Sequence, residues 1–109
     1  MHMADLDKGL ELVPTDEYTK CIYIPIGVGV AVPPWNFPLS LLGGMVAAAV
    51  VTGNTIVCKP SSDTPIVAYK FVELGEKAGF PAGVVNYIPG SGSDIGDYIV
   101  EHPLTRFVN

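Results

Sequence analysis

The fold class follows from residues 22–58, which read IYIPIGVGVAVPPWNFPLSLLGGMVAAAVVTGNTIVC. The β-branched run over 22–32 is apolar on both faces, which predicts a strand covered on both sides, as in a parallel sheet. The Ala- and Leu-rich run over 39–52 predicts a buried helix, and Gly53-Asn54 is a helix stop. Residues 55–58 predict a second short strand. The order strand, helix, strand is that of a parallel α/β unit.

The same alternation continues toward the C-terminus. A second helix is predicted over 65–78 and a third strand over 84–88. A third helix over 93–101, capped by Ser93, and a fourth strand over 106–108 complete the pattern. The inward face of the second helix is expected to carry Val67, Phe71, Leu74 and Ala78. The sequence therefore predicts an α/β fold: an open doubly wound parallel sheet (Rossmann-like) with about four strands and three helices, truncated.

The first twenty residues differ in character from the rest. Residues 1–20 are mostly polar and predict an N-terminal arm, with a short edge strand at most. Met1-His2-Met3 is neither basic nor followed by an apolar signal region, and we expect it to be a tag remnant. Residues 21–109 are expected to form the folded unit.

Composition excludes several classes of function. The 109 residues hold 6 Lys and Arg against 11 Asp and Glu, a net charge of −5 with no basic cluster, so no nucleic-acid partner is expected. The longest apolar run, 37–51, is shorter than the roughly 18 residues that span a bilayer, so no membrane segment is expected. Cys21 and Cys58 have no metal-ligand spacing to each other or to His2 and His102, so no metal site is expected. Two free thiols indicate a reducing compartment, such as the cytoplasm.

Ligands of open parallel sheets bind at the carboxyl ends of the strands. This rule selects three loops: 33–38, 59–65 and 89–94. In the third, a glycine-rich turn opens a helix, which either suits a phosphate or is only a turn. In the second, Lys59 is either a solvated side chain or a contact to sugar or phosphate. The hydroxyls of Ser61 and Ser62 either bind ribose or phosphate, or cap the next helix.

The first loop places the single Trp of the chain and an Asn between three prolines. Prolines restrict the backbone, and a rigid loop can hold an amide in place. Asn36 is therefore a candidate donor to a developing oxyanion. The alternative is that Asn36 only caps the helix that begins near Pro38.

Several strings over about residues 18–109 are similar, in order and spacing, to those of the aldehyde dehydrogenase superfamily. They are PWNFP at 34–38, GNT at 53–55, KPS at 59–61, GFPxGVVN at 79–86 and GxGxxxG at 90–96. Three further strings look most like the 1-pyrroline-5-carboxylate (glutamate semialdehyde) dehydrogenase branch. These are YIPIGVGV at 23–30, GSG at 90–92 and TRF at 105–107.

The resemblance implies that residues 21–109 are a partial NAD(P)-binding Rossmann-like domain. It also implies a role for each candidate residue. Asn36 would be the catalytic oxyanion donor. The nicotinamide and its ribose would be lined by the backbone at Val32, Pro33, Pro34 and Trp35. Lys59 would bind the adenosine ribose, with Ser61 and Ser62 beside it, and the adenine would be flanked by Gly90, Asp94 and Ile95. Many NAD-preferring members have Glu where this chain has Ser62, which leaves both NAD and NADP open as coenzyme.

The implied activity is that of a longer parent enzyme, expected to be a homo-oligomer. It would oxidise an aldehyde, expected to be glutamate 5-semialdehyde, to the carboxylic acid through a Cys thioester, with NAD or NADP as oxidant. The family's nucleophilic Cys and general-base Glu lie outside the matched strings, so the 109 residues alone are expected to be inactive. Glu73-Leu74-Gly75-Glu76-Lys77 mimics the family's base motif, and we interpret it as a helix surface. The alternative function is a self-standing nucleotide-binding or interaction module, which a reading frame ending near residue 109 would favour.

Overall fold

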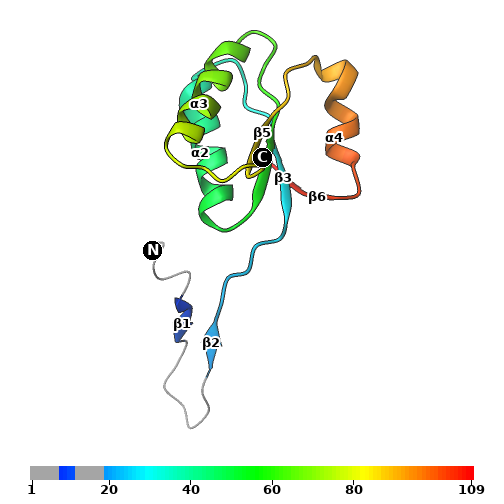
Figure 1. Ribbon diagram of the computed structural model, residues 1–109. Coiled ribbons are helices and arrows are strands. Elements are labelled where there is room, and N and C mark those ends of the chain that lie inside the picture. The colour runs from blue at the N-terminus through cyan, green and yellow to red at the C-terminus, as the bar shows by residue number, and fades with distance from the viewer. Residues whose placement is uncertain (1–7, 12–18) are drawn as a thin grey trace.

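A parallel four-stranded sheet forms the centre of the computed structural model, which describes residues 8–11 and 19–109 (Figure 1). Its strands are β3 (Val28–Ala31), β4 (Thr55–Cys58), β5 (Val85–Tyr87) and β6 (Thr105–Val108), in the order β5-β4-β3-β6. From β3 the chain adds β4 and β5 on one side and then returns to place β6 on the other. The order therefore reverses between β3 and β6, which is the usual ligand position in such sheets.

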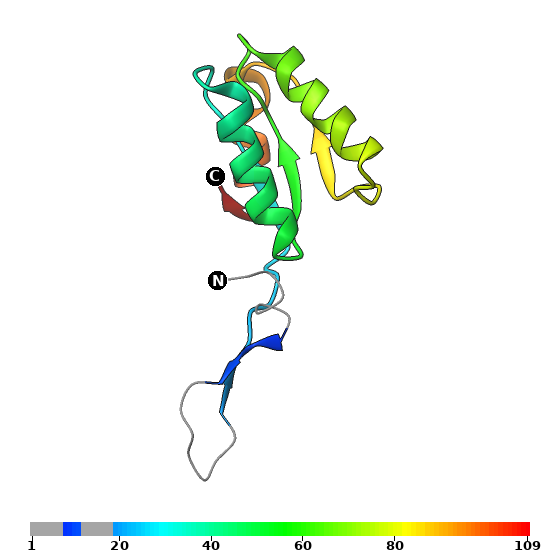
Figure 2. The ribbon, with the colours of Figure 1, turned by 90° about the vertical axis from the view of Figure 1, so that its left-hand side faces the viewer.

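Helices cover both faces of this sheet (Figures 1 and 2). One face carries α2 (Pro38–Val51) and α3 (Pro65–Lys77). The other carries a single π-helical turn, η1 (Gly92–Gly96), which continues into α4 (Asp97–Glu101). The predicted doubly wound α/β fold is confirmed. None of the helices in the described residues reaches the length and apolar character that crossing a membrane requires.

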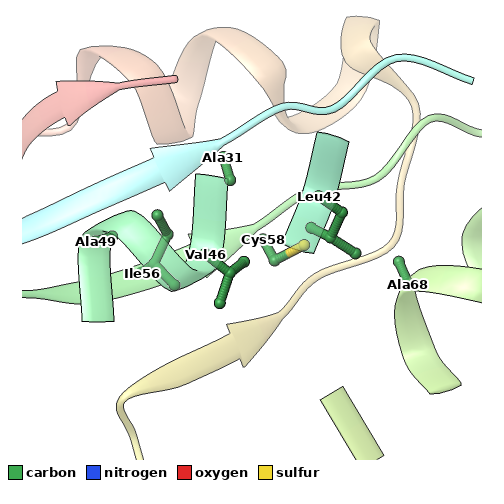
Figure 3. Close-up of a cluster of buried hydrophobic side chains, with 7 residues drawn as sticks. All are labelled: Ala31, Leu42, Val46, Ala49, Ile56, Cys58 and Ala68. Carbon is green, nitrogen blue, oxygen red and sulfur yellow. The ribbon is translucent and has the colours of Figure 1, made fainter. Parts of the chain in front are cut away.

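The core lies between α2 and the sheet (Figure 3). Alternation along the strands sends Ile56 and Cys58 toward α2, while Val57 lies on the α4 side. On α2, the inward residues Leu42 and Val46 are four positions apart, as one face of a helix requires. The buried cluster consists of Ala31, Leu42, Val46, Ala49, Ile56, Cys58 and Ala68.

The inward face of α3 differs from the prediction. Its buried residues are Ala68, Val72 and Gly75, whereas Leu74 is 62% exposed and Ala78 is also exposed. A Cβ at position 75 would lie 2.5 Å from the ring of Phe80, so the helix turns a small residue toward that ring. The predicted stripe of Val67, Phe71, Leu74 and Ala78 is therefore wrong except for the half-buried Val67 and Phe71.

The first strand of the sheet is shorter than the predicted run over 22–32. Only Val28–Ala31 form β3, and residues 22–26 are exposed coil. Pro25 has no N–H for a strand ladder, and Gly27 has a positive φ of 119°, which breaks an extended strand. Cys21 belongs instead to the arm, where β2 (Lys20–Cys21) pairs with β1 (Leu10–Glu11) in an antiparallel hairpin away from the sheet (Figure 1).

Two helix caps considered from the sequence are not formed: the predicted Ser93 cap and the alternative reading of Asn36 as a cap. Helix α2 begins at Pro38 with Phe37 at the N-cap position, so Asn36 does not cap it. The turn that precedes α4 is capped by Ser91, whose hydroxyl accepts the Asp94 N–H at 3.2 Å, and not by Ser93. Both predictions rested on residue type alone, whereas the cap position depends on which residue first leaves the helical backbone.

Candidate functional site

The three loops selected from the sequence start at one level of the same sheet edge. Ala31, Cys58 and Tyr87 are in register across the three neighbouring strands. The next residues continue the ladder: the Lys59 N–H donates to the Ala31 carbonyl, and the Ile88 N–H donates to the Cys58 carbonyl, both at 2.9 Å. The structure thus brings the three loops side by side, as parallel strands require.

The loop after β3 is hydrogen-bonded to the end of β6, the neighbouring strand at which the strand order reverses. The Val32 N–H donates to the Asn109 carbonyl at 2.9 Å, and the Asn109 N–H donates to the Val30 carbonyl at 2.8 Å. Pro33 is buried, whereas Trp35 is 64% exposed. Pro34 and Asn36 are also exposed, and no described residue hydrogen-bonds to the Asn36 amide. The loop therefore combines an anchored backbone with an amide whose donors are free for a ligand.

Lys59 is a buried cation at this edge. The residue is only 5% exposed, and its Nζ donates to the carbonyl of its neighbour Pro60 at 3.3 Å. Neither ion pair among the described residues includes it. An ammonium group has three N–H donors, so two remain for a ligand, and burial makes a hydroxyl or anionic partner favourable. The alternative of Lys59 as a solvated side chain is therefore excluded.

The two serines after Lys59 have different surroundings. Ser61 shapes the loop, because its hydroxyl accepts the Asp63 N–H and its carbonyl accepts the Thr64 N–H, both at 3.2 Å. Ser62 is exposed and makes no hydrogen bond with a described residue. Thr64 occupies the N-cap position of α3 without a side-chain cap, so neither serine caps that helix. The Ser62 hydroxyl is therefore available at the surface.

The loop after β5 makes a close turn. A Cβ at Gly90 would lie 2.7 Å from Cδ1 of Ile95, so a larger residue here would require the Ile95 side chain to shift. Ser93 donates its hydroxyl to the Asp94 carboxylate at 3.2 Å. This carboxylate stands at the helix N-terminus, where a bound phosphate would be repelled by it. The turn fits a neutral flat ring beside Gly90 and Ile95 better than a phosphate.

Asn54 is a site-supporting residue that sequence reasoning treated only as part of a helix stop. Its Oδ1 accepts the N–H groups of Ile26 and Gly27 at 2.7 and 3.0 Å. Its Nδ2 donates to the Thr52 hydroxyl at 2.9 Å and to the Ala49 carbonyl at 3.4 Å. The buried amide thus ties the end of α2 to the start of β3. An Asn directly before a strand was the available signal, but the Ile26 and Gly27 N–H groups that it accepts are 28 and 27 positions away in the sequence.

Two groups that imitate catalytic residues are unsuited to that role. Burial raises the pKa of the Cys58 thiol to about 11, so it is neutral near pH 7 and a poor nucleophile. Glu73 lies on α3 and pairs with Lys70 at 2.6 Å and with Lys77 at 2.8 Å. The hydrogen bond from Lys70 and then that from Lys77 lower the pKa of Glu73 to about 2, which is far from the value that suits a general base.

Other sites are not evident at this edge. Among the described residues, no three His, Cys, Asp or Glu side chains gather closely enough to hold a metal ion. A hollow of about 400 Å³ lies at the opposite, amino end of β3, between residues 23–26 and 50–54. An apolar hollow of about 230 Å³ runs beneath α4 and reaches Ile88.

The sequence pattern of the aldehyde dehydrogenase family matches residues 1–109. This chain belongs to the aldehyde dehydrogenase family. The relative from Anoxybacillus flavithermus, a 1-pyrroline-5-carboxylate dehydrogenase, is 60% identical over 93 residues. That match covers 85% of this chain and 18% of the relative, so the chain spans about a fifth of the relative's length. A 1-pyrroline-5-carboxylate dehydrogenase from Geobacillus thermodenitrificans matches to the same extent.

Two solved structures share the fold of this chain over most of its length. The 1-pyrroline-5-carboxylate dehydrogenase from Thermus with bound NAD is 44% identical, with a TM-score of 0.84 over 92% of this chain and 20% of that one. Proline utilization A from Bdellovibrio bacteriovorus is 43% identical, with a TM-score of 0.92 over 97% of this chain and 11% of that one. The predicted resemblance to the family and its 1-pyrroline-5-carboxylate dehydrogenase branch is confirmed.

Proposed function

We propose that this chain supplies the coenzyme-binding edge and the oxyanion donor of an enzyme that oxidises glutamate 5-semialdehyde to the carboxylic acid. The observation that carries the proposal is the meeting of three loops at one sheet edge, with the buried Lys59 ammonium and the free Asn36 amide among them. The 60% identity to a 1-pyrroline-5-carboxylate dehydrogenase supports this choice of substrate.

The residues at the edge fit an NAD molecule. The two spare donors of Lys59 suit the hydroxyls of the adenosine ribose, with Ser61 and Ser62 beside them. The closely packed Gly90 and Ile95, with Asp94 at the rim, suit the neutral adenine better than a phosphate. The backbone from Val32 to Trp35, whose first N–H donates to the Asn109 carbonyl, suits the nicotinamide end. The proposed coenzyme-binding residues are Val32, Pro33, Pro34, Trp35, Lys59, Ser61, Ser62, Gly90, Asp94 and Ile95.

NAD, when bound, supplies the hydride acceptor, and this chain supplies orientation and electrostatics. The Asn36 amide donates a hydrogen bond to the aldehyde oxygen as that oxygen gains negative charge during attack by a thiolate. Removing one such donor typically costs on the order of 100- to 1,000-fold in rate. Cys58 and Glu73 are unsuited to act as thiolate and general base, and we expect both groups to come from the rest of the enzyme.

The test uses the full-length enzyme that contains this chain. We expect NADH to form with 1-pyrroline-5-carboxylate at a kcat/KM at least tenfold above that with benzaldehyde or acetaldehyde. Asn36→Ala is expected to lower kcat by about 100-fold or more with little change in the KM for NAD. The 109 residues expressed alone are expected to form no NADH above the blank. A preference for another aldehyde would refute the substrate, and an unchanged kcat in Asn36→Ala would refute the donor role.

A further inference from the structure

The backbone of Phe37 is left-handed, with φ 48° and ψ 49°. In residues 8–11 and 19–109 it is the one non-glycine residue with a positive φ. Bulky L-residues adopt this conformation only at an energetic cost. The Phe37 side chain is 74% exposed, so packing of its ring within this chain does not offset that cost. Strained residues of this kind concentrate at functional sites, and Phe37 directly follows Asn36.

The conformation of Phe37 decides whether Asn36 caps helix α2. With a right-handed backbone, Phe37 would become the first helical residue, and Asn36 would stand at the N-cap position that its type favours. Its side-chain oxygen would then accept the Leu39 N–H, because Pro38 has none. In the structure the helix begins at Pro38, the Phe37 carbonyl accepts the Leu41 N–H at 3.1 Å, and no side chain caps the helix.

Pro38 explains why the right-handed alternative is avoided. A proline ring clashes with the backbone of the preceding residue in the α region, so Phe37 cannot easily extend the helix backwards. Proline itself is well suited to the first helical position. The pair Phe37-Pro38 thus starts the helix and, at the same step, excludes Asn36 from its cap.

We propose that Phe37 is a positioning residue, whose left-handed backbone keeps the Asn36 amide out of the helix cap and holds it toward the reacting carbonyl. The proposal rests on the proposed function, in which Asn36 is the oxyanion donor. Phe37 acts here through its backbone and not through its ring. In the sequence Asn36-Phe37-Pro38, helix α2 therefore lacks a side-chain cap, and the Asn36 amide stays free for a ligand.

The test compares two variants of the full-length enzyme that both remove the ring. Phe37→Asn tolerates the left-handed region, whereas Phe37→Val is β-branched and does not. We expect the kcat of Phe37→Val to be about 100-fold below that of Phe37→Asn, since a small displacement of a catalytic group can have that effect. The KM for NAD is expected to agree within about threefold. With Asn36→Ala added to both variants, the difference in kcat is expected to disappear.

The outcomes separate this proposal from the one before. If Asn36→Ala lowers kcat but Phe37→Val and Phe37→Asn are equal, the positioning role is wrong and the donor role stands. If Asn36→Ala leaves kcat unchanged, the donor role is wrong, and the positioning role falls with it. The melting temperature is a second measurement: Phe37→Gly is expected to melt about 1 to 2 °C above Phe37→Ala, because glycine adopts the left-handed region freely. Equal or reversed melting temperatures would refute the strain on which the proposal depends.

Discussion

Replacement of Ser62 by Glu tests the placement of the second loop. Ser62 is exposed, hydrogen-bonds to no described residue and follows Lys59, the proposed ribose contact, by three positions. A neutral hydroxyl does not repel the 2′-phosphate of NADP, whereas a carboxylate would. We therefore expect the full-length enzyme to use NADP as well as NAD, and Ser62→Glu to impair NADP use far more than NAD use.

The exposure of Ser62 sets the expected magnitude. Two unit charges 4 Å apart in a water-like medium interact by about 1 kcal/mol, and a phosphate monoester carries a charge of about −1.5 to −2. The repulsion is then about 1.5 to 2 kcal/mol, or a 10- to 30-fold loss in kcat/KM for NADP relative to NAD. Because the site is exposed, about 0.5 M salt should reduce this effect by screening.

The assay measures kcat/KM for both coenzymes at saturating aldehyde in wild type, Ser62→Glu and Ser62→Gln. The Gln variant matches Glu in size without its charge, so its coenzyme ratio is expected to stay within about threefold of wild type. A coenzyme ratio that is unchanged in Ser62→Glu would show that Ser62 does not face the ribose. The same shift in Ser62→Gln would show that size, and not charge, is responsible.

Three further changes test the site and its support. Lys59→Ala should weaken binding of NAD and NADP alike, by about tenfold in Kd, while Lys70→Ala on the outer surface of α3 should leave both unchanged. Asn54→Ala should lower the free energy of unfolding by about 2–3 kcal/mol in urea titrations, because two main-chain N–H groups lose their acceptor. The control Asn86→Ala removes one exposed hydrogen bond and should lower the free energy of unfolding by less than about 1 kcal/mol. The raised pKa of Cys58 means that its thiolate fraction at pH 8 is lower than that of an ordinary thiol and grows as pH rises toward about 11. Iodoacetamide should accordingly label Cys58 at pH 8 more than about tenfold slower in the native protein than in urea, and equal rates would contradict its burial.

Local patterns were sufficient for the order of elements and for the edge that carries the site. The strands predicted over 55–58 and 106–108 correspond to β4 and β6, and the helix predicted over 39–52 corresponds to α2 (Pro38–Val51). Alternation of strands and helices implies parallel strands, and parallel strands place their carboxyl ends together. The loops that hold Asn36, Lys59 and Gly90 could therefore be selected from the sequence alone.

The tertiary structure decided which side of each element is buried and which polar groups are engaged. Leu74 is exposed because α3 turns Gly75 toward Phe80, a contact that the helical period of the apolar residues does not contain. Pro25 and Gly27 end the strand pattern before Val28, but only folding brings Asn54 to the main-chain N–H groups of Ile26 and Gly27. Asn36 does not cap α2 because the backbone of its neighbour Phe37 is left-handed. Burial and hydrogen bonding depend on partners brought together by folding, and residue type alone specifies only what each group can do.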